Sequence, residues 1–381
     1  MSETFLYRLR FIRTVKFMGG DIDSYLEEKR RLFKKSSSKI KNNRVFDFNY
    51  IPPKPFMREE VKPVIDALLR YQQTGIANNV LILGCRGSGK SVMAKYLMGA
   101  LSQKGELKFA YANCRQYNTS FKILASLLEL EFRGYGLDEL WVRFTDSFKS
   151  KTVIVLDEVD LMSEKDRHKD ILYLVSRSPN NYMVVLLSNN PKFLNQLDES
   201  TRSTLQPEII HFRSYNAIEI QHILMDRSKH GLTSMPVTTI NEIAAMTVKN
   251  TNSDIRVAIK TLYRWAIEPE IPLAQTFEKA RRDIVIDIIN DLNDKNLLIL
   301  KAAITRTDEY VKDVYSEYCR LSAQYKEEPF SYMHFYTNLS YLQSLGLILL
   351  VSTKLNRTYT NRIQVTFDPH ILETIWELRF G

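Results

Sequence analysis

Residues 79–91 read NVLILGCRGSGKS, and this stretch decides the fold. The apolar run 80–83 predicts a buried strand, and 84–91 match the pattern G-x-x-x-x-G-K-[ST] at every fixed position. The glycines of such a loop allow backbone N–H groups to turn toward phosphate oxygens. The helix expected from about Lys90 points its positive N-terminal end at the same anion. The stretch therefore predicts a strand, a phosphate-binding loop and a helix.

Each polar residue of this loop has an expected task. Lys90 places a positive charge at the outer phosphates, and the Ser91 hydroxyl can ligate magnesium. A glycine-rich turn without a ligand is the alternative, but strand, loop and helix in register favour a nucleotide, ATP or ADP with Mg²⁺. The residues predicted to bind it are Gly84, Arg86, Gly87, Ser88, Gly89, Lys90, Ser91 and Val92.

Two further apolar runs end in polar residues. Residues 152–160 read TVIVLDEVD, in which Asp157 is expected to hold the magnesium and Glu158 to polarise an attacking water. Residues 183–190 read MVVLLSNN, which places Asn189 at a strand end near the γ-phosphate. Because the carboxyl ends of parallel strands meet at one edge of a sheet, these side chains are predicted to face one nucleotide.

Composition sets outer limits on the class of protein. The 381 residues suggest two or three domains, and 44% hydrophobic with 25% charged residues indicates a soluble globular chain. The net charge of +9 fits a polyanionic partner such as DNA. Three scattered cysteines without metal spacing favour a reducing compartment. The N-terminal run is interrupted by Arg8, Arg10 and Arg13, which argues against a signal peptide. We expect a cytoplasmic protein, associated with the nucleoid if its polyanionic partner is DNA.

The order of patterns along the chain predicts the domains. Residues 1–18 could form a strand or an amphipathic helix, and the basic run 29–44 is read as a solvated linker rather than as a phosphate-contacting arm. Strands and helices then alternate to about 212, as in a parallel α/β sheet covered on both faces. Helical spacing dominates over 216–268 and again over 277–300.

The C-terminal pattern is typical of a winged helix. A helix over 308–325 and a turn precede a second helix that Ser331 caps and Gly346 ends. Two alternating strands around a polar tip follow over 347–367. The predicted boundaries are therefore a basic extension (1–45), an α/β nucleotide-binding domain (46–212), a helical lid (213–285) and a winged-helix domain (286–381).

The chain resembles archaeal replication initiators of the origin-recognition-complex type, a branch of the AAA+ ATPases, over about 46–368. The resemblance rests on ordered segments that include YIPPKPFMREE, NCRQYNT, VIVLDEVD, LLSNN and SDIRVA. It implies that Arg58 lies near the adenine pocket, that Tyr215 packs on the base, and that Arg227 approaches the nucleotide from the lid. It also implies that Arg256 reaches the γ-phosphate.

One segment departs from the family pattern. The family usually carries D-x-R-V-x-S-x-L after the first sensor, whereas this chain has Ser200 at the arginine position and Arg202 nearby. This departure weakens the expectation of an arginine finger for a neighbouring subunit.

DNA contacts are expected on the winged helix. The helix from Ser331 would face a major groove and the hairpin tip would face phosphates or the minor groove, although packing and a solvated turn are the alternatives. The candidate DNA-binding residues are Ser331, Tyr332, His334, Tyr336, Lys354, Arg357, Thr358, Tyr359, Asn361 and Arg362. The resemblance implies a second contact from about 115–138.

The combined reading is an ATP-binding replication initiator that binds origin double-stranded DNA. It would help to recruit or load the replicative helicase, with paralogous initiators as further partners, and slow ATP hydrolysis would act as a switch. A transcriptional regulator on the same scaffold is one alternative. A motor or clamp-loader ATPase is another, and it predicts an oligomerising helical collar in place of the winged helix.

Overall fold

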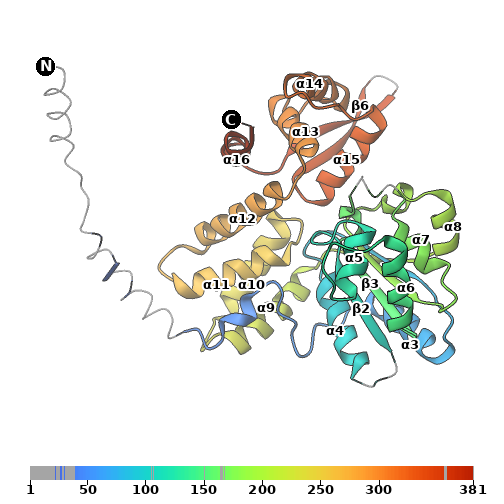
Figure 1. Ribbon diagram of the computed structural model, residues 1–381. Helices are drawn as coiled ribbons and strands as arrows, with labels where there is room; N and C mark the ends of the chain where they lie inside the picture. Colours follow the sequence, from blue (N-terminus) through green and yellow to red (C-terminus); the bar gives the residue numbers. More distant parts are fainter. Residues whose placement is uncertain are drawn as a thin grey trace, which may run out of the picture.

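The structure is a computed structural model, which describes residues 39–380 except 104, 106, 150, 164, 165, 167, 356 and 357, together with residues 22, 26, 27 and 30. The predicted structure of the remaining basic extension, and Arg357 at the hairpin tip, lie outside the described residues. Figure 1 shows an α/β unit, a helical unit beside it, and a C-terminal unit that is joined to the helical unit through helix α12.

A parallel sheet carries the α/β unit, as predicted. Its five strands have the spatial order β2-β3-β4-β1-β5, and every neighbouring pair is parallel. Helices on both faces bury β3 and β4 completely, which is why these strands read as continuous apolar runs. The strands are β1 (Val80–Gly84), β2 (Lys108–Asn113), β3 (Thr152–Asp157), β4 (Met183–Ser188) and β5 (Glu208–Phe212).

Helices cover the sheet on its two faces. One apolar cluster joins α3 and α4 to the sheet, and a second cluster joins α5, α6 and α7 to its other face. These helices are α3 (Val61–Thr74), α4 (Lys90–Ser102), α5 (Ser120–Leu127), α6 (Leu137–Ser147), α7 (Asp170–Ser176) and α8 (Glu199–Leu205), with short 3₁₀ turns at Asn43–Phe46, Val159–Leu161 and Phe193–Gln196.

The helical unit also contains residues 43–46, which the predicted boundaries divide between the basic extension and the α/β domain. Val45 and Phe46, in the 3₁₀ turn Asn43–Phe46, are buried in the same apolar cluster as α9, α10 and α11. The predicted boundary at residue 45 thus divides one packed segment, because the apolar side chains on both sides of it dock on this unit. Its helices are α9 (Ala217–Gly231), α10 (Val237–Asn250), α11 (Ile255–Ile267) and α12 (Leu273–Asn290).

Gly231 allows Val45 and Phe46 to pack closely because it has no side chain, and a substitution there tests this contact. A Cβ atom at Gly231 would lie 2.3 Å from Val45 and 2.7 Å from Phe46. Gly231→Ala is therefore expected to lower the free energy of unfolding by about 1–3 kcal/mol, as overpacking does. Gly99→Ala is the matched control, because nothing lies within 4 Å of that Cβ position in α4. It should raise stability by about 0.5–1 kcal/mol. Urea unfolding of both variants measures the two changes in the free energy of unfolding. Changes of the same sign would contradict this packing.

The C-terminal unit has the predicted order of a winged helix. Ser331 caps α15 through a hydrogen bond from the His334 N–H, and Gly346 after this helix has a φ of +75°. The hairpin of β6 and β7 follows, with an antiparallel register that pairs Ile348 with Val365. The elements are α13 (Asp294–Thr305), α14 (Val311–Gln324), α15 (Tyr332–Ser344), β6 (Ile348–Leu355), β7 (Thr358–Val365) and α16 (His370–Phe380).

Helix α12 crosses the expected boundary at 285/286 without interruption. Its residues Phe277, Ile284 and Ile288 are buried in one cluster with the C-terminal helices. The change of direction comes at 291–293 instead, where Asn293 caps α13. The helix therefore packs with both units and joins them.

Candidate nucleotide site

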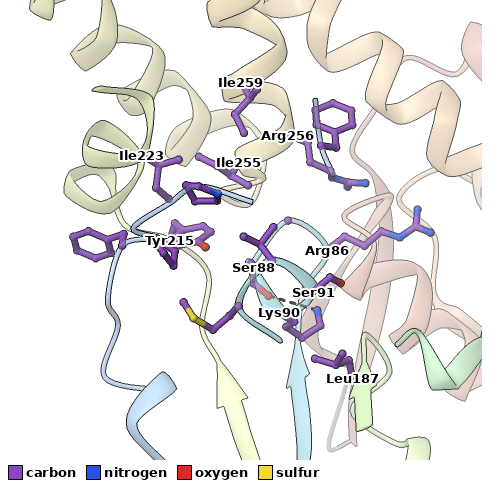
Figure 2. A pocket seen from close by; sticks show the side chains of 18 of the residues that line it. Arg86, Ser88, Lys90, Ser91, Leu187, Tyr215, Ile223, Ile255, Arg256 and Ile259 are labelled. Atoms are coloured by element: carbon purple, nitrogen blue, oxygen red, sulfur yellow. Dashed lines mark hydrogen bonds between the residues drawn. The ribbon is translucent and has the colours of Figure 1, made fainter. Parts of the chain in front are cut away.

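A cavity of about 480 Å³ opens at the carboxyl ends of the strands, between the α/β unit and the helical unit. Figure 2 shows apolar side chains such as Ile223 and Ile259 at one end of it, and Arg86 and Arg256 at the other. The lining takes in the phosphate loop, the ends of β3 and β4, and the first turn of α11. One end is therefore suited to an apolar base and the other to anionic phosphates.

Two glycines of the loop have no room for a side chain. Gly87 and Gly89 have φ angles of +75° and +88°, which L side chains rarely adopt. A Cβ atom would also lie 2.3 Å from an Asp254 carboxylate oxygen at Gly87, and 2.0 Å from the Tyr215 hydroxyl at Gly89. The helical unit thus packs directly on the loop, through Asp254 and Tyr215.

Lys90 is held inside the loop. Its ammonium donates hydrogen bonds to the carbonyl oxygens of Gly84 (2.7 Å) and Cys85 (2.9 Å) and to Asn189 Oδ1 (2.9 Å). Burial lowers the pKa of Lys90 to about 8, although the Asp160 and Asp157 carboxylates act in the opposite direction. Asn189 therefore meets the loop lysine just beyond β4, and its place near the γ-phosphate stays a prediction.

The residues predicted to hold magnesium lie together. Asp157 is buried, and burial raises its pKa, while hydrogen bonds from Ser91 and Tyr111 act to lower it. The described residues contain no group of three or more His, Cys, Asp or Glu that could hold a metal. A hydroxyl and one carboxylate nevertheless fit magnesium, which keeps several waters and takes its other oxygens from phosphates.

Glu158 is held by neighbours that the sequence interpretation did not assign. Its carboxylate accepts hydrogen bonds from Arg115 Nε (3.0 Å) and Nη2 (3.2 Å), and from Asn113 Nδ2 (3.3 Å). Its backbone is left-handed, with a φ of +54°. Both oxygens of the proposed catalytic carboxylate are thus occupied by an arginine that follows β2.

The base end of the cavity is lined by apolar side chains from the N-terminal segment and the helical unit. The Phe56 and His222 rings lie 5.5 Å apart, and Tyr215 enters from the loop side. The apolar and aromatic lining residues here are Phe48, Pro52, Pro55, Phe56, Tyr215, Ile223, Ile255 and Ile259. Tyr215 thus lines the cavity, and its packing on a base stays a prediction. The proline-rich segment and Ile259 were not predicted to line the site.

Arg58 lies behind the loop rather than along the cavity. Its guanidinium donates to the carbonyl oxygens of Ser88 (3.1 Å) and Arg213 (2.8 Å), and it stacks 4.4 Å from the Tyr215 ring centroid. Gly84 also lies outside the lining, and a Cβ atom there would lie 2.5 Å from the Phe212 carbonyl oxygen. No part of Arg58 lines the cavity. Its contacts with the Ser88 carbonyl oxygen and the Tyr215 ring instead hold the loop and Tyr215 in position.

Arg227 lines the cavity but its guanidinium is turned toward the N-terminal segment. It donates to the carbonyl oxygens of Val45, Asp47 (3.2 Å) and Tyr50 (3.4 Å), and it stacks 4.7 Å from the Tyr50 ring. Arg256 lines the opposite end and is paired with Asp254 through its Nε, at 2.9 Å. Contact of either arginine with nucleotide stays a prediction.

The segment that departs from the family pattern lies on α8. The Ser200 hydroxyl accepts a hydrogen bond from Arg177 Nη2 at 3.2 Å, and Arg202 is exposed. None of these three residues lines the cavity. The role of either arginine toward a neighbouring subunit stays a prediction.

The residues predicted to contact DNA have different surroundings. Tyr332 (47% exposed), His334 and Lys354 are exposed. Tyr336 instead accepts a hydrogen bond from Asn361 at 2.6 Å, and Arg362 packs 5.0 Å from the Tyr310 ring, well away from the tip. The side chains of Thr358 and Tyr359 are not among those described.

The chain is similar to a known protein family and to several characterised proteins. A family model described as an AAA domain matches residues 77–214. The ORC1-type DNA replication protein 1 of Sulfurisphaera tokodaii is 29% identical over 348 residues, covering 82% of this chain and 86% of that protein. The ORC1-type DNA replication protein of Thermococcus onnurineus is 25% identical over 394 residues, covering 93% and 94%.

Solved structures share the fold. The structure of the Aeropyrum pernix ORC1 protein in complex with DNA has a TM-score of 0.64 at 20% identity, covering 90% of this chain and 98% of that one. The Aeropyrum pernix ORC2 protein (ADPNP-ADP complexes) has a TM-score of 0.61 at 19% identity, covering 90% and 99%.

Fold and site together define the class: an AAA+ nucleotide-binding fold with a helical unit and a C-terminal winged helix. Over most of its length the chain is similar to archaeal ORC1-type DNA replication proteins, so the resemblance inferred from its motifs is confirmed. Among the described residues, no helix is long and apolar enough to cross a membrane.

Proposed function

We propose that this protein is an ATP-binding DNA replication initiator that binds origin double-stranded DNA. The observation that carries the proposal is one chain with both a complete phosphate loop under an apolar base pocket and an exposed winged helix. The ORC1-type names of its relatives, and a solved ORC1 protein in complex with DNA, support the same function.

In this proposal, nucleotide would bind with its base between Tyr215 and Ile223 and its phosphates on the loop. Ser91 and Asp157 would hold Mg²⁺, which would neutralise charge on the phosphates. Lys90 would contact the outer phosphates, and Arg256 would exchange Asp254 for the γ-phosphate. Glu158 would polarise the attacking water slowly, so that nucleotide acts as a switch. Recruitment or loading of the replicative helicase, with paralogous initiators, would follow from DNA binding.

Substitutions in the helix α15 and in the hairpin are expected to weaken DNA binding in different ways. Lys354→Ala is expected to weaken binding to specific and random duplexes alike and to lower the log–log salt slope by about one, because a phosphate contact releases counterions. Tyr332→Ala should weaken binding to the specific site by a further 1–3 kcal/mol or so if it contacts a base. Fluorescence anisotropy at several salt concentrations measures both.

Lys249→Ala, on an exposed face of α10, is the control for a lost positive charge. It should leave affinity and salt slope unchanged. If neither Lys354→Ala nor Tyr332→Ala alters affinity for any duplex, the C-terminal unit is not the DNA-binding module, and a motor or clamp-loader ATPase becomes the better reading.

A transcriptional regulator is the second candidate function. Ser200 at the usual arginine position favours it, because a protein without a finger for its neighbour has less need for assembly-driven hydrolysis. Genome-wide mapping of the bound sites separates the two functions. Occupancy at replication origins supports the initiator, whereas occupancy confined to promoters supports the regulator.

A further inference from the structure

A strap of the chain, residues 45–58, passes from the helical unit to the α/β unit along the base end of the cavity. Figure 1 shows the segment that contains it, in blue, beside the helical unit and before α3. The strap begins in the 3₁₀ turn Asn43–Phe46, which is buried against the helical unit. The strap residues that line the cavity are Phe48, Pro52, Lys54, Pro55 and Phe56. The strap is therefore one wall of the base pocket.

This wall has little regular structure of its own. Residues 47–60 contain no helix or strand, and Pro52, Pro53 and Pro55 have no backbone N–H to donate. A strand or helix is fixed by its own ladder of backbone hydrogen bonds, and the strap has no such ladder. Its position against the cavity therefore depends on contacts with side chains.

Arg227 of α9 supplies the main contact at the start of the strap. Its side chain is buried, with 5% of the residue exposed. The guanidinium donates to the carbonyl oxygens of Val45, Asp47 (3.2 Å) and Tyr50 (3.4 Å), and it stacks 4.7 Å from the Tyr50 ring centroid. A planar guanidinium can serve several acceptors and a ring at once, which an ammonium cannot. One side chain thus fixes six residues of the strap on the helical unit.

Arg58 holds the other end of the strap on the α/β unit. It donates to the carbonyl oxygens of Ser88 in the phosphate loop (3.1 Å) and of Arg213 after β5 (2.8 Å). The lining residues of the strap lie between these two arginine contacts. Midway, the Phe56 ring lies 5.5 Å from the His222 ring of α9. The wall of the base pocket is therefore fixed only while both ends of the strap are held.

We propose that Arg227 is a positioning residue for the nucleotide base, which holds the strap as a wall of the base pocket and does not act on the phosphates. A nucleotide then gains affinity from the strap through its base, whereas its phosphates bind to the loop independently of Arg227. The inference rests on the proposed binding of ATP. It gives Arg227 a different task from the approach to the nucleotide that the family resemblance implies.

The test compares two ligands, ATP with Mg²⁺ and inorganic triphosphate with Mg²⁺, by isothermal titration into the full-length protein. Arg227→Ala is expected to weaken ATP binding about 10- to 50-fold and triphosphate binding less than about 2-fold, because only ATP carries a base. Arg227→Lys keeps the positive charge but loses the planar fork, so it should recover only part of the ATP affinity.

Tyr50→Ala covers the case in which loss of the buried arginine unfolds the helical unit. It removes the ring that stacks on the guanidinium, and Tyr50 itself does not line the cavity. ATP binding should weaken about 2- to 5-fold, as expected for one lost cation–π contact, with triphosphate binding unchanged. Lys229→Ala is the matched control, because it removes an exposed positive charge from the same helix. It should leave the affinity for both ligands unchanged.

An equal loss of ATP and triphosphate affinity in Arg227→Ala would show that the arginine acts on the phosphates, and it overturns the proposal. Unchanged ATP affinity in both Arg227→Ala and Tyr50→Ala overturns it as well. Amide hydrogen exchange is the readout that needs no ligand, because Arg227→Lys and Tyr50→Ala should each speed exchange over 45–50. If the wild type binds no ATP, the proposed function fails, and unchanged exchange over 45–50 then overturns the role of Arg227 separately.

Discussion

Lys90→Ala is expected to weaken ATP binding about 10- to 150-fold, because a hydrogen bond to a charged group contributes about 1.5–3 kcal/mol. The ammonium is already placed among the carbonyl oxygens of Gly84 and Cys85 and the Asn189 amide oxygen, so it needs little rearrangement to reach a phosphate. Isothermal titration of ATP into wild type and variant measures the loss.

Lys95→Ala is the matched control for this experiment. Lys95 lies on the same helix, α4, but its ammonium stacks 5.1 Å from the Tyr111 ring and does not line the cavity. ATP affinity should therefore be unchanged. Equal affinity in wild type and Lys90→Ala would contradict the assignment of the phosphate loop.

Glu158→Gln is expected to keep ATP binding within about 2-fold while lowering turnover about 10²- to 10⁴-fold, the usual contribution of a general base. The amide fits the same space but cannot take a proton from the attacking water. Glu199→Gln on α8, outside the cavity, is the control and should turn over ATP normally. Phosphate release with saturating ATP measures kcat for each protein.

Turnover that survives in Glu158→Gln would show that another group activates the water. Besides Asp157, Asp160 is a carboxylate in the turn that follows Glu158, but it accepts hydrogen bonds from the Ser188 hydroxyl (2.8 Å) and the Asn189 N–H (3.0 Å). It therefore serves to hold the end of β4 in place. The two substitutions, Lys90→Ala and Glu158→Gln, separate loss of binding from loss of chemistry.

Much of the nucleotide site follows from the sequence alone. The loop glycines, Lys90, Asp157 and Glu158 stand at strand ends whose apolar runs predict a parallel sheet, and such a sheet brings them to one edge. The same holds for the cap at Ser331, where a local hydrogen bond starts α15. These features depend on short-range patterns, which is why a single sequence predicts them.

Contacts between distant segments were decided only by the tertiary structure. Arg58 and Arg227 were predicted beside the nucleotide. The structure places Arg58 behind the loop and Arg227 on the cavity lining, and each guanidinium donates to backbone carbonyl oxygens of another segment, a choice that no local pattern encodes. The pairing of Arg115 with Glu158 and Asp291 likewise arises only when β2, β3 and the end of α12 meet. Sequence patterns determine which elements form and which ends carry polar residues. The packing of the three units determines which partner each charge finds, because ion pairs are selected by distance in space and not by spacing along the chain.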